Sequence, residues 1–259
     1  MTLLTEPTRI VLAKEFSLRS ALFAGTQGVW YDPSDLTTVF QDAAGTVAGA
    51  VDQPVGRILD ISGNGNHASQ AVSGDRPTLR SSGGLYWLEF VAGVNDELRT
   101  AGFLENSPGF YAVAGVSMDS RGGSASSMYF GVGLKGAVTG NPSVMGLAGR
   151  TDVVQDQTTG QRLAGVVASA NARNFYSIGN AFVGEGYQES GVIVARVNNF
   201  NPTIAKYPSL GAPQLNNSLA IQSEVSMKFF GGIFVKREVD ENMKTLCRQF
   251  LAAKSGVTL

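Results

Sequence analysis

The chain has 259 residues, of which 43% are apolar and 16% charged, and its 20 basic and 21 acidic side chains leave a formal net charge of −1. The basic residues form no run that could grip a phosphate backbone, and no apolar stretch approaches 18 residues, so we expect neither a nucleic-acid partner nor membrane insertion. One cysteine and one histidine exclude an intrachain disulfide and a histidine-based metal site, and we predict no metal and no cofactor.

Residues 1–27 differ from the rest of the chain and are expected to form an N-terminal arm or helix. Their large apolar side chains fall on more than one helical face, and a helix that is apolar nearly all round has to be covered. The cover is either the domain's own surface or another chain, and the second alternative makes this an attachment segment that favours homo-oligomers. The side chains assigned to attachment are Ile10, Val11, Leu12, Phe16, Leu18, Leu22 and Phe23.

From residue 28 onward, short apolar runs alternate with turns rich in Gly, Pro and Asn. This spacing is typical of an all-β sandwich, and residues 28–259 are long enough to form it as one domain. The predicted strands cover residues 85–90, 110–116, 128–132, 144–147, 163–167, 175–178, 192–197, 219–222 and 227–235.

A short helix is predicted at the C-terminal end. Asp240 is a good N-cap and Gly256 a good C-terminal stop, with Lys254 in the last turn. The expected apolar face places Cys247 in the core as a small hydrophobic residue. The other members of this face are Met243, Leu246, Phe250 and Leu251.

No enzyme signature is found in the sequence. A glycosidase needs two carboxylates held on rigid elements. The acidic run Glu238, Asp240 and Glu241 instead lies at the start of the predicted helix, where carboxylates cap the N-terminus. Residues 185–189 are expected to form a loop, and neither a Gly-x-Ser-x-Gly motif nor a phosphate-binding loop is present. We therefore predict no catalytic residues.

The segment from Asp60 to Asn66 matches the first half of a calcium-binding EF-hand loop. Position 12 of the pattern is Ala71, where a bidentate Glu is required, so a metal-free tight turn is the favoured interpretation. Gly63 and Gly65 are expected to take positive φ in this turn. His67 is expected to be solvated or bound to backbone rather than a general base.

Aromatic side chains in turn-rich stretches are candidate platforms for a ligand, since loops at the ends of sandwiches often carry binding sites. Tyr187 and Tyr207 lie near Gly or Pro, and Asn199 lies in a stretch rich in Asn. These three residues are the predicted ligand-binding set.

Two stretches resemble the opening of a phage virion-protein family. They are GVWYDPSDLTTVFQD at residues 28–42 and PVGRILDISGNGNHA at residues 54–68, and the likeness continues at residues 76–79, 84–90 and 230–235. The resemblance implies a concanavalin A-like, laminin G-like jelly roll. One departure is that residues 90–96 lack the first acidic residue of the family's Phe-Asp-Gly-x-x-Asp-like turn, which leaves a calcium role of this turn without support.

The resemblance also implies a setting. We expect a non-enzymatic tail or fibre protein in the virion, bound to other virion proteins through residues 1–27 and adhering to host-surface glycan. The alternatives are a purely structural tail or capsid decoration protein and, less favoured, a polysaccharide-cleaving enzyme.

Overall fold

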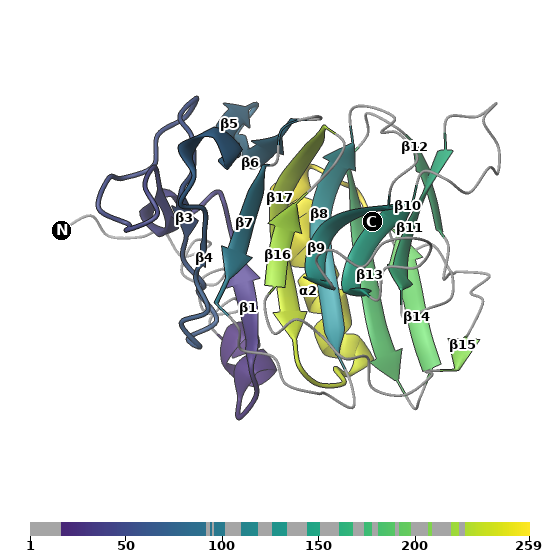
Figure 1. Ribbon diagram of the computed structural model, residues 1–259. Helices are drawn as coiled ribbons and strands as arrows, with labels where there is room; N and C mark the ends of the chain where they lie inside the picture. The colour runs from purple at the N-terminus through teal and green to yellow at the C-terminus, as the bar shows by residue number, and fades with distance from the viewer. Residues whose placement is uncertain are drawn as a thin grey trace.

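A computed structural model shows two antiparallel β-sheets packed face to face (Figure 1). It describes residues 17–91, 94, 96–101, 110–118, 126–133, 144–150, 161–167, 174–177, 181–189, 192–197, 207–208, 219–222 and 226–259. The chain therefore has the predicted all-β architecture, a sandwich of the jelly-roll type.

Within the described residues, sheet A has eight strands and sheet B has nine. Sheet A runs in the order β15 (Tyr207–Pro208), β14 (Val192–Val197), β13 (Ala181–Glu189), β8 (Tyr111–Met118), β17 (Met227–Val235), β6 (Leu85–Phe90) and β5 (Thr78–Ser82), with β1 (Gly28–Tyr31) also paired to β17. Sheet B runs in the order β12 (Asn174–Ser177), β11 (Gln161–Val167), β10 (Val144–Arg150), β9 (Ser126–Gly133), β16 (Leu219–Gln222), β7 (Glu97–Thr100), β4 (Ala68–Ser69), β3 (Arg57–Ile58) and β2 (Val39–Phe40). Two short 3-10 helices, η1 (Leu36–Thr38) and η2 (Ser73–Asp75), lie in the connections.

The strands expected at residues 85–90, 192–197, 219–222 and 227–235 are confirmed as β6, β14, β16 and β17. The loop expected at residues 185–189 is wrong, because these residues end β13. Residues 185–189 all pair with β14, and residues 185–187 also pair with β8, so the segment belongs to the sheet despite the local glycine.

Helix α2 (Glu241–Ser255) packs on the face of sheet A that points away from sheet B, against β6, β8, β13 and β17 (Figure 1). Its predicted ends are confirmed. The Asp240 side chain accepts a hydrogen bond from the Met243 N–H, and Gly256 has the left-handed conformation with φ 69°. Cys247 is fully buried, and burial raises the pKa of its thiol.

The predicted apolar face of α2 needs one correction. Leu246 is 46% exposed, whereas Lys244 and Arg248 are buried. The buried face is therefore rotated relative to the apolar pattern, because Arg248 forms an ion pair with Glu185 of β13, with an Nη1–Oε1 distance of 2.7 Å.

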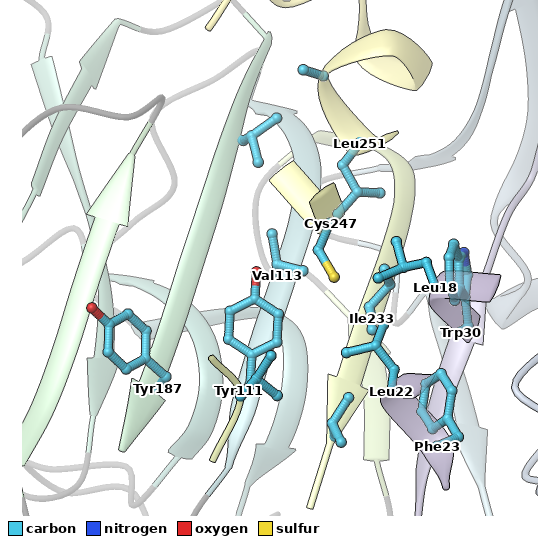
Figure 2. Packing of buried hydrophobic residues seen from close by; sticks show 14 residues of the cluster. Leu18, Leu22, Phe23, Trp30, Tyr111, Val113, Tyr187, Ile233, Cys247 and Leu251 are labelled. Atoms are coloured by element: carbon cyan, nitrogen blue, oxygen red, sulfur yellow. The ribbon is translucent and has the colours of Figure 1, made fainter. Parts of the chain in front are cut away.

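Residues 17–23 form a helix that packs into the same core as α2 (Figure 2). Leu18 and Phe23 are each 8% exposed and Leu22 is fully buried, in a cluster that includes Trp30 and Ile233. The assignment of Leu18, Leu22 and Phe23 to attachment is therefore wrong, since their own domain covers them. The other attachment residues, Ile10, Val11, Leu12 and Phe16, lie outside the described residues.

Candidate functional site

The segment from Asp60 to Asn66 joins β3 to β4 as a tight turn around one carboxylate. Oδ1 of Asp60 accepts from the backbone N–H groups of Trp30 and Ser62, each at 2.9 Å, and Oδ2 accepts from the Ser62 hydroxyl at 2.7 Å and the Asn66 N–H at 3.0 Å. Gly63 and Gly65 have φ of 97° and 75°, which confirms the predicted turn geometry. Among the described residues, no three acidic, Cys or His side chains converge as a metal site would require.

This turn fixes the end of sheet B to the first strand of sheet A. The Asn66 side-chain amide donates to the Gly28 carbonyl at 2.9 Å, and the Tyr31 hydroxyl donates to the Asn66 carbonyl at 2.6 Å. Tyr31 is fully buried, and burial together with the nearby Asp60 carboxylate raises the pKa of its hydroxyl. The turn therefore holds β3 and β4 in a defined place relative to the core.

The outward face of sheet B at this end carries a row of four side chains across four strands. The register pairs Phe40 with Arg57, Arg57 with Ser69, and Ser69 with Arg99. Ser69 is exposed, and the other three are half-buried. Facing residues of adjacent antiparallel strands have Cβ atoms about 5 Å apart, so the row forms a continuous surface. We call these four residues the sheet B row.

The opposite side chains of the same strands face the core. Val39, Ile58, Ala68 and Leu98 are all fully buried. Because successive strand residues point to opposite faces, their burial fixes the outward direction of the sheet B row. Helix α2 lies on the far side of sheet A and does not reach this row (Figure 1).

Arg99 is held rigidly at one end of the row. Its Nε and Nη2 atoms donate to the two carboxylate oxygens of Glu97 at 2.6 and 2.8 Å. The two side chains are 20% and 13% exposed. A bidentate pair of this kind fixes the orientation of both groups. On the neighbouring strand β16, Gln222 lies opposite Glu97.

Arg57 lies between Phe40 and Ser69 in the row and contacts the loop that follows β2. Its Nη1 atom donates to the Ala44 carbonyl at 3.2 Å. Gly45 has φ 78°, and a Cβ atom there would lie 3.2 Å from the Arg57 Cδ, so the loop accommodates the arginine closely. The buried Arg57 Nε has no hydrogen-bond partner among the described residues.

His67 precedes β4 beside this row. Its Nδ1 atom accepts a hydrogen bond from the Asp60 backbone N–H at 3.0 Å, as expected for a backbone-bonded imidazole. Burial and then the Arg57 charge lower the pKa of His67, while the Asp60 carboxylate acts in the opposite direction. The imidazole therefore senses Arg57 electrostatically.

The predicted ligand-binding residues do not form this site. Tyr187 is 3% exposed on β13, with the Lys244 ammonium 3.6 Å from its ring centroid, so its predicted position on an exposed loop is wrong. Tyr207 begins the edge strand β15, and its side chain lies outside the described part of the structure. Asn199 lies outside the described residues altogether.

A second aromatic surface lies on the outer face of sheet A at Trp87. Its indole packs on Phe230, with ring centroids 5.8 Å apart, and the Lys228 ammonium lies 5.4 Å from the indole centroid. The ring thus already contacts an aromatic group and a cation. Nearby, Arg80 of β5 bridges Asp52 and Glu89, at 2.8 Å each. The side chains of this surface therefore already contact one another.

The predicted strands do not include the strands that carry the sheet B row. Strands β2, β3 and β4 have two residues each, so they show no alternation of apolar and polar side chains that could reveal their register.

No protein-family model and no curated protein sequence matches the chain. Among solved structures, it is similar to a mutant GH54 α-L-arabinofuranosidase soaked with 4-nitrophenyl α-L-arabinofuranoside, with a TM-score of 0.61 and 11% identity over 92% of this chain and 65% of that chain. A Trypanosoma rangeli sialidase in complex with the inhibitor DANA gives a TM-score of 0.52 at 13% identity, over 98% of this chain and 39% of that chain. The binding domain of botulinum neurotoxin DC in complex with SialylT gives 0.50 at 12% identity, over 85% of this chain and 52% of that chain.

These likenesses define the class of fold. The chain spans just under two thirds of the length of the arabinofuranosidase and a smaller share of the other two. At identities of 11 to 13%, the comparisons establish a shared β-sandwich. Function has to be argued from the site itself.

Proposed function

We propose that the protein is a non-enzymatic phage virion component, of the tail or fibre type, that adheres to host-surface glycan through the sheet B row. The observation that carries the adhesion proposal is the outward alignment of Phe40, Arg57, Ser69 and Arg99 on four adjacent strands. The virion setting is supported by the sequence resemblance alone, and two of the segments that carry it contain β2 and β3 of this row.

The chemistry of the row suits a sugar surface. A pyranose presents an apolar ring face and several hydroxyls, which call for an aromatic contact and for hydrogen-bonding groups held in fixed positions. Phe40 supplies the aromatic contact, Ser69 a hydroxyl, and the Arg99–Glu97 pair oriented donors and acceptors. Rigid elements hold all of them, which lowers the entropy cost of binding.

The printed names of the structural neighbours support a carbohydrate ligand in general terms. A neurotoxin binding domain in complex with SialylT and an arabinofuranosidase soaked with 4-nitrophenyl α-L-arabinofuranoside share this fold over part of their length. From these names we transfer to this chain only carbohydrate binding in general.

The proposed absence of catalysis is supported by four carboxylates that form ion pairs with arginine. Arg80 lies between Asp52 and Glu89, and Arg248 lies between Glu185 and Glu241. Each of these carboxylates accepts from a guanidinium, whereas glycoside hydrolysis needs one carboxyl group that donates a proton.

Attachment to other virion proteins is proposed for the apolar residues that the structure does not describe, Ile10, Val11, Leu12 and Phe16. In this proposal a neighbouring copy or another virion protein covers these apolar side chains. Where the partner is a neighbouring copy, the result is a homo-oligomer in the virion.

The adhesion proposal is tested by glycan-array binding of the full chain, followed by titration of the best ligand. Ser69→Leu places a bulky side chain in the middle of the row without removing a core contact. The matched control is Ser82→Leu, because Ser82 is also an exposed strand serine but lies on sheet A. We expect Ser69→Leu to weaken binding at least tenfold and Ser82→Leu to leave it unchanged.

Two results would contradict the proposal in different ways. Equal binding by both variants would place the ligand elsewhere on the molecule. Failure of the unmodified chain to bind any glycan, together with its presence in virions, would favour the purely structural alternative.

A polysaccharide-cleaving enzyme is the second candidate, and one observation favours it. Asp96 is 5% exposed, and burial raises its pKa, with Asp75 and Glu89 acting in the same direction. A buried carboxyl with a raised pKa is a feature of general acids. Release of reducing sugar from a polysaccharide, abolished in Asp96→Asn, would establish this activity, whereas we expect no release by the unmodified chain.

A further inference from the structure

Two arginines lie at the same end of strands β2, β3 and β4. Arg57 begins β3. Arg76 spans the ends of the flanking strands, because its guanidinium donates to the Gln41 carbonyl after β2 and to the Gln70 and Ala71 carbonyls after β4, at 2.9 to 3.2 Å. The two guanidinium groups therefore belong to one edge of the sheet B face.

Backbone carbonyls hold both groups. Arg57 donates to Ala44, and no ion pair within 4.0 Å joins Arg57 or Arg76 to a carboxylate in the part of the chain that is described. By contrast, Arg80, Arg99 and Arg248 each have a carboxylate partner. Carbonyls orient a guanidinium but leave its charge uncompensated by an opposite unit charge.

Two of the acidic side chains around this edge, those of Asp42 and Glu97, have other partners. Both oxygens of Asp42 accept from Thr46, and one of them also from the Val47 N–H. Glu97 is paired with Arg99, and Asp75 lies in η2, beside Arg76 in sequence. The buried Nε of Arg57 has no hydrogen-bond partner among the described residues. After a small movement of the side chain, this N–H could donate to an oxygen atom of a ligand.

We propose that Arg57 and Arg76 form an anion subsite at the end of the sheet B row, and that the glycan is therefore an acidic one, bearing carboxylate or sulfate groups. This inference rests on the proposed glycan adhesion and names its ligand class. A planar guanidinium matches a carboxylate or a sulfate with two parallel hydrogen bonds, and two guanidiniums at one edge favour an anion over a neutral hydroxyl. The anion lies beside Ser69 and Phe40, where the rest of the sugar packs.

The test compares glycans that differ only in charge. The full chain is titrated with polygalacturonate and with the same polymer after reduction of its carboxyl groups, and in parallel with 3′-sialyllactose, 6-sulfated lactose and lactose. We expect at least one acidic member to bind tenfold or more tightly than its neutral counterpart, with affinity that falls as salt rises.

Arg57→Gln is the diagnostic variant, because it removes the charge while an amide can still donate to Ala44. It should lower the ratio of the affinity for the acidic ligand to the affinity for the neutral one at least tenfold. Arg80→Gln is the control, since Arg80 is a surface arginine on the other sheet with carboxylate partners. Arg76→Gln is measured together with its melting temperature, because this arginine also satisfies three carbonyls.

The possible failures separate the two proposals. Equal affinity for acidic and neutral forms would overturn the anion subsite and leave glycan adhesion standing. An acidic preference that persists in Arg57→Gln would place the anion away from this edge and would also overturn the inference. Binding of no glycan at all would overturn both.

Discussion

At the scale of single residues, the pKa of His67 can be measured as a probe of the sheet B row, because the chain has one histidine. Its Nδ1 accepts from the Asp60 N–H, which requires the unprotonated nitrogen, and burial and Arg57 lower its pKa from 6.5. The folded state therefore favours the neutral imidazole. Stability should fall as pH drops below 6.5, because the unfolded chain then binds the proton more readily.

We expect nuclear magnetic resonance titration of the His67 ring protons to give a pKa below 6.5, and Arg57→Gln to raise it. The variant removes a nearby positive charge that disfavours protonation. Arg80→Gln, on the other sheet, should leave the titration unchanged. A pKa above 6.5 in the unmodified chain would mean that the Asp60 carboxylate outweighs burial and Arg57.

The contribution of Asp96 to stability is expected to depend on pH in the opposite sense. Burial raises its pKa above 3.8, so its contribution to stability is present below that pH and is lost as pH rises through the folded-state pKa. Asp96→Asn keeps an oxygen to accept from the Val91 N–H and removes the charge. We expect the variant to have a higher free energy of unfolding than the unmodified chain at pH 7, by an amount that shrinks toward pH 4. A constant difference between pH 4 and pH 8, measured by denaturant unfolding, would contradict this assignment.

At the scale of elements, α2 is joined to sheet A by a buried polar network as well as by apolar packing. Glu185 of β13 accepts from Arg248 at 2.7 Å and from the Tyr111 hydroxyl at 3.0 Å. The side chains of Arg248 and Glu185 are 6% and 1% exposed. Removing one partner from such a pair leaves the other charge buried and uncompensated.

Arg248→Met should therefore lower the free energy of unfolding by about 3 to 5 kcal/mol, the usual cost of breaking a buried ion pair. The double variant Glu185→Leu with Arg248→Met should recover much of that loss, because two apolar side chains of similar size leave no isolated charge. Arg80→Met is the control and should cost no more than about 1 kcal/mol, since its partners are partly exposed. If Arg248→Met is as mild as Arg80→Met in denaturant unfolding, the network does not hold the helix.

Local signals predict this helix well and its buried face poorly. Asp240 and Gly256 act within one turn of the chain, so their cap roles can be read from the sequence. The burial of Arg248 depends on Glu185, 63 residues away, and a pattern that counts charged residues as outward selects Leu246 instead. Tyr187 is misjudged for the same reason, because its strand is defined by pairing with distant β8.

The sheet B row is harder still to predict. Arg57 and Arg99 share a face only because β4 pairs with both β3 and β7, and the second of these pairings joins residues 68–69 to residues 99–100. The Asp60 turn, by contrast, follows from Asx and Gly residues within seven positions, and its geometry is predicted correctly. Sequence reasoning therefore identifies the turn that supports the site but not the side chains that it presents.

At the scale of the whole molecule, the two ends of the described chain close against each other. The Lys236 N–H donates to the Gln27 carbonyl at 2.9 Å, and the Lys254 ammonium lies 2.7 Å from Oδ2 of Asp32. The helix at residues 17–23 and α2 contribute to one apolar cluster around Trp30 (Figure 2). The part of the N-terminal segment that is described thus belongs to the sandwich.

These contacts predict that two N-terminal truncations differ sharply in stability. Removal of residues 1–16 leaves Leu18, Leu22 and Phe23 in place, and we expect the domain to melt within a few degrees of the full chain. Removal of residues 1–23 uncovers the cluster. Each buried apolar side chain contributes about 1.5 to 3 kcal/mol, so the longer truncation should lose several kcal/mol of stability or precipitate.

The same pair of truncations separates core packing from attachment. If Ile10, Val11, Leu12 and Phe16 bind a neighbouring copy, the full chain should be oligomeric in sedimentation at micromolar concentration, and the chain without residues 1–16 should be a folded monomer. Identical sedimentation of these two forms would remove the case for self-attachment through residues 1–16, and Leu18, Leu22 and Phe23 are already buried in their own domain. A stable, soluble chain without residues 1–23 would contradict the core role of the helix, because three large side chains would then be dispensable.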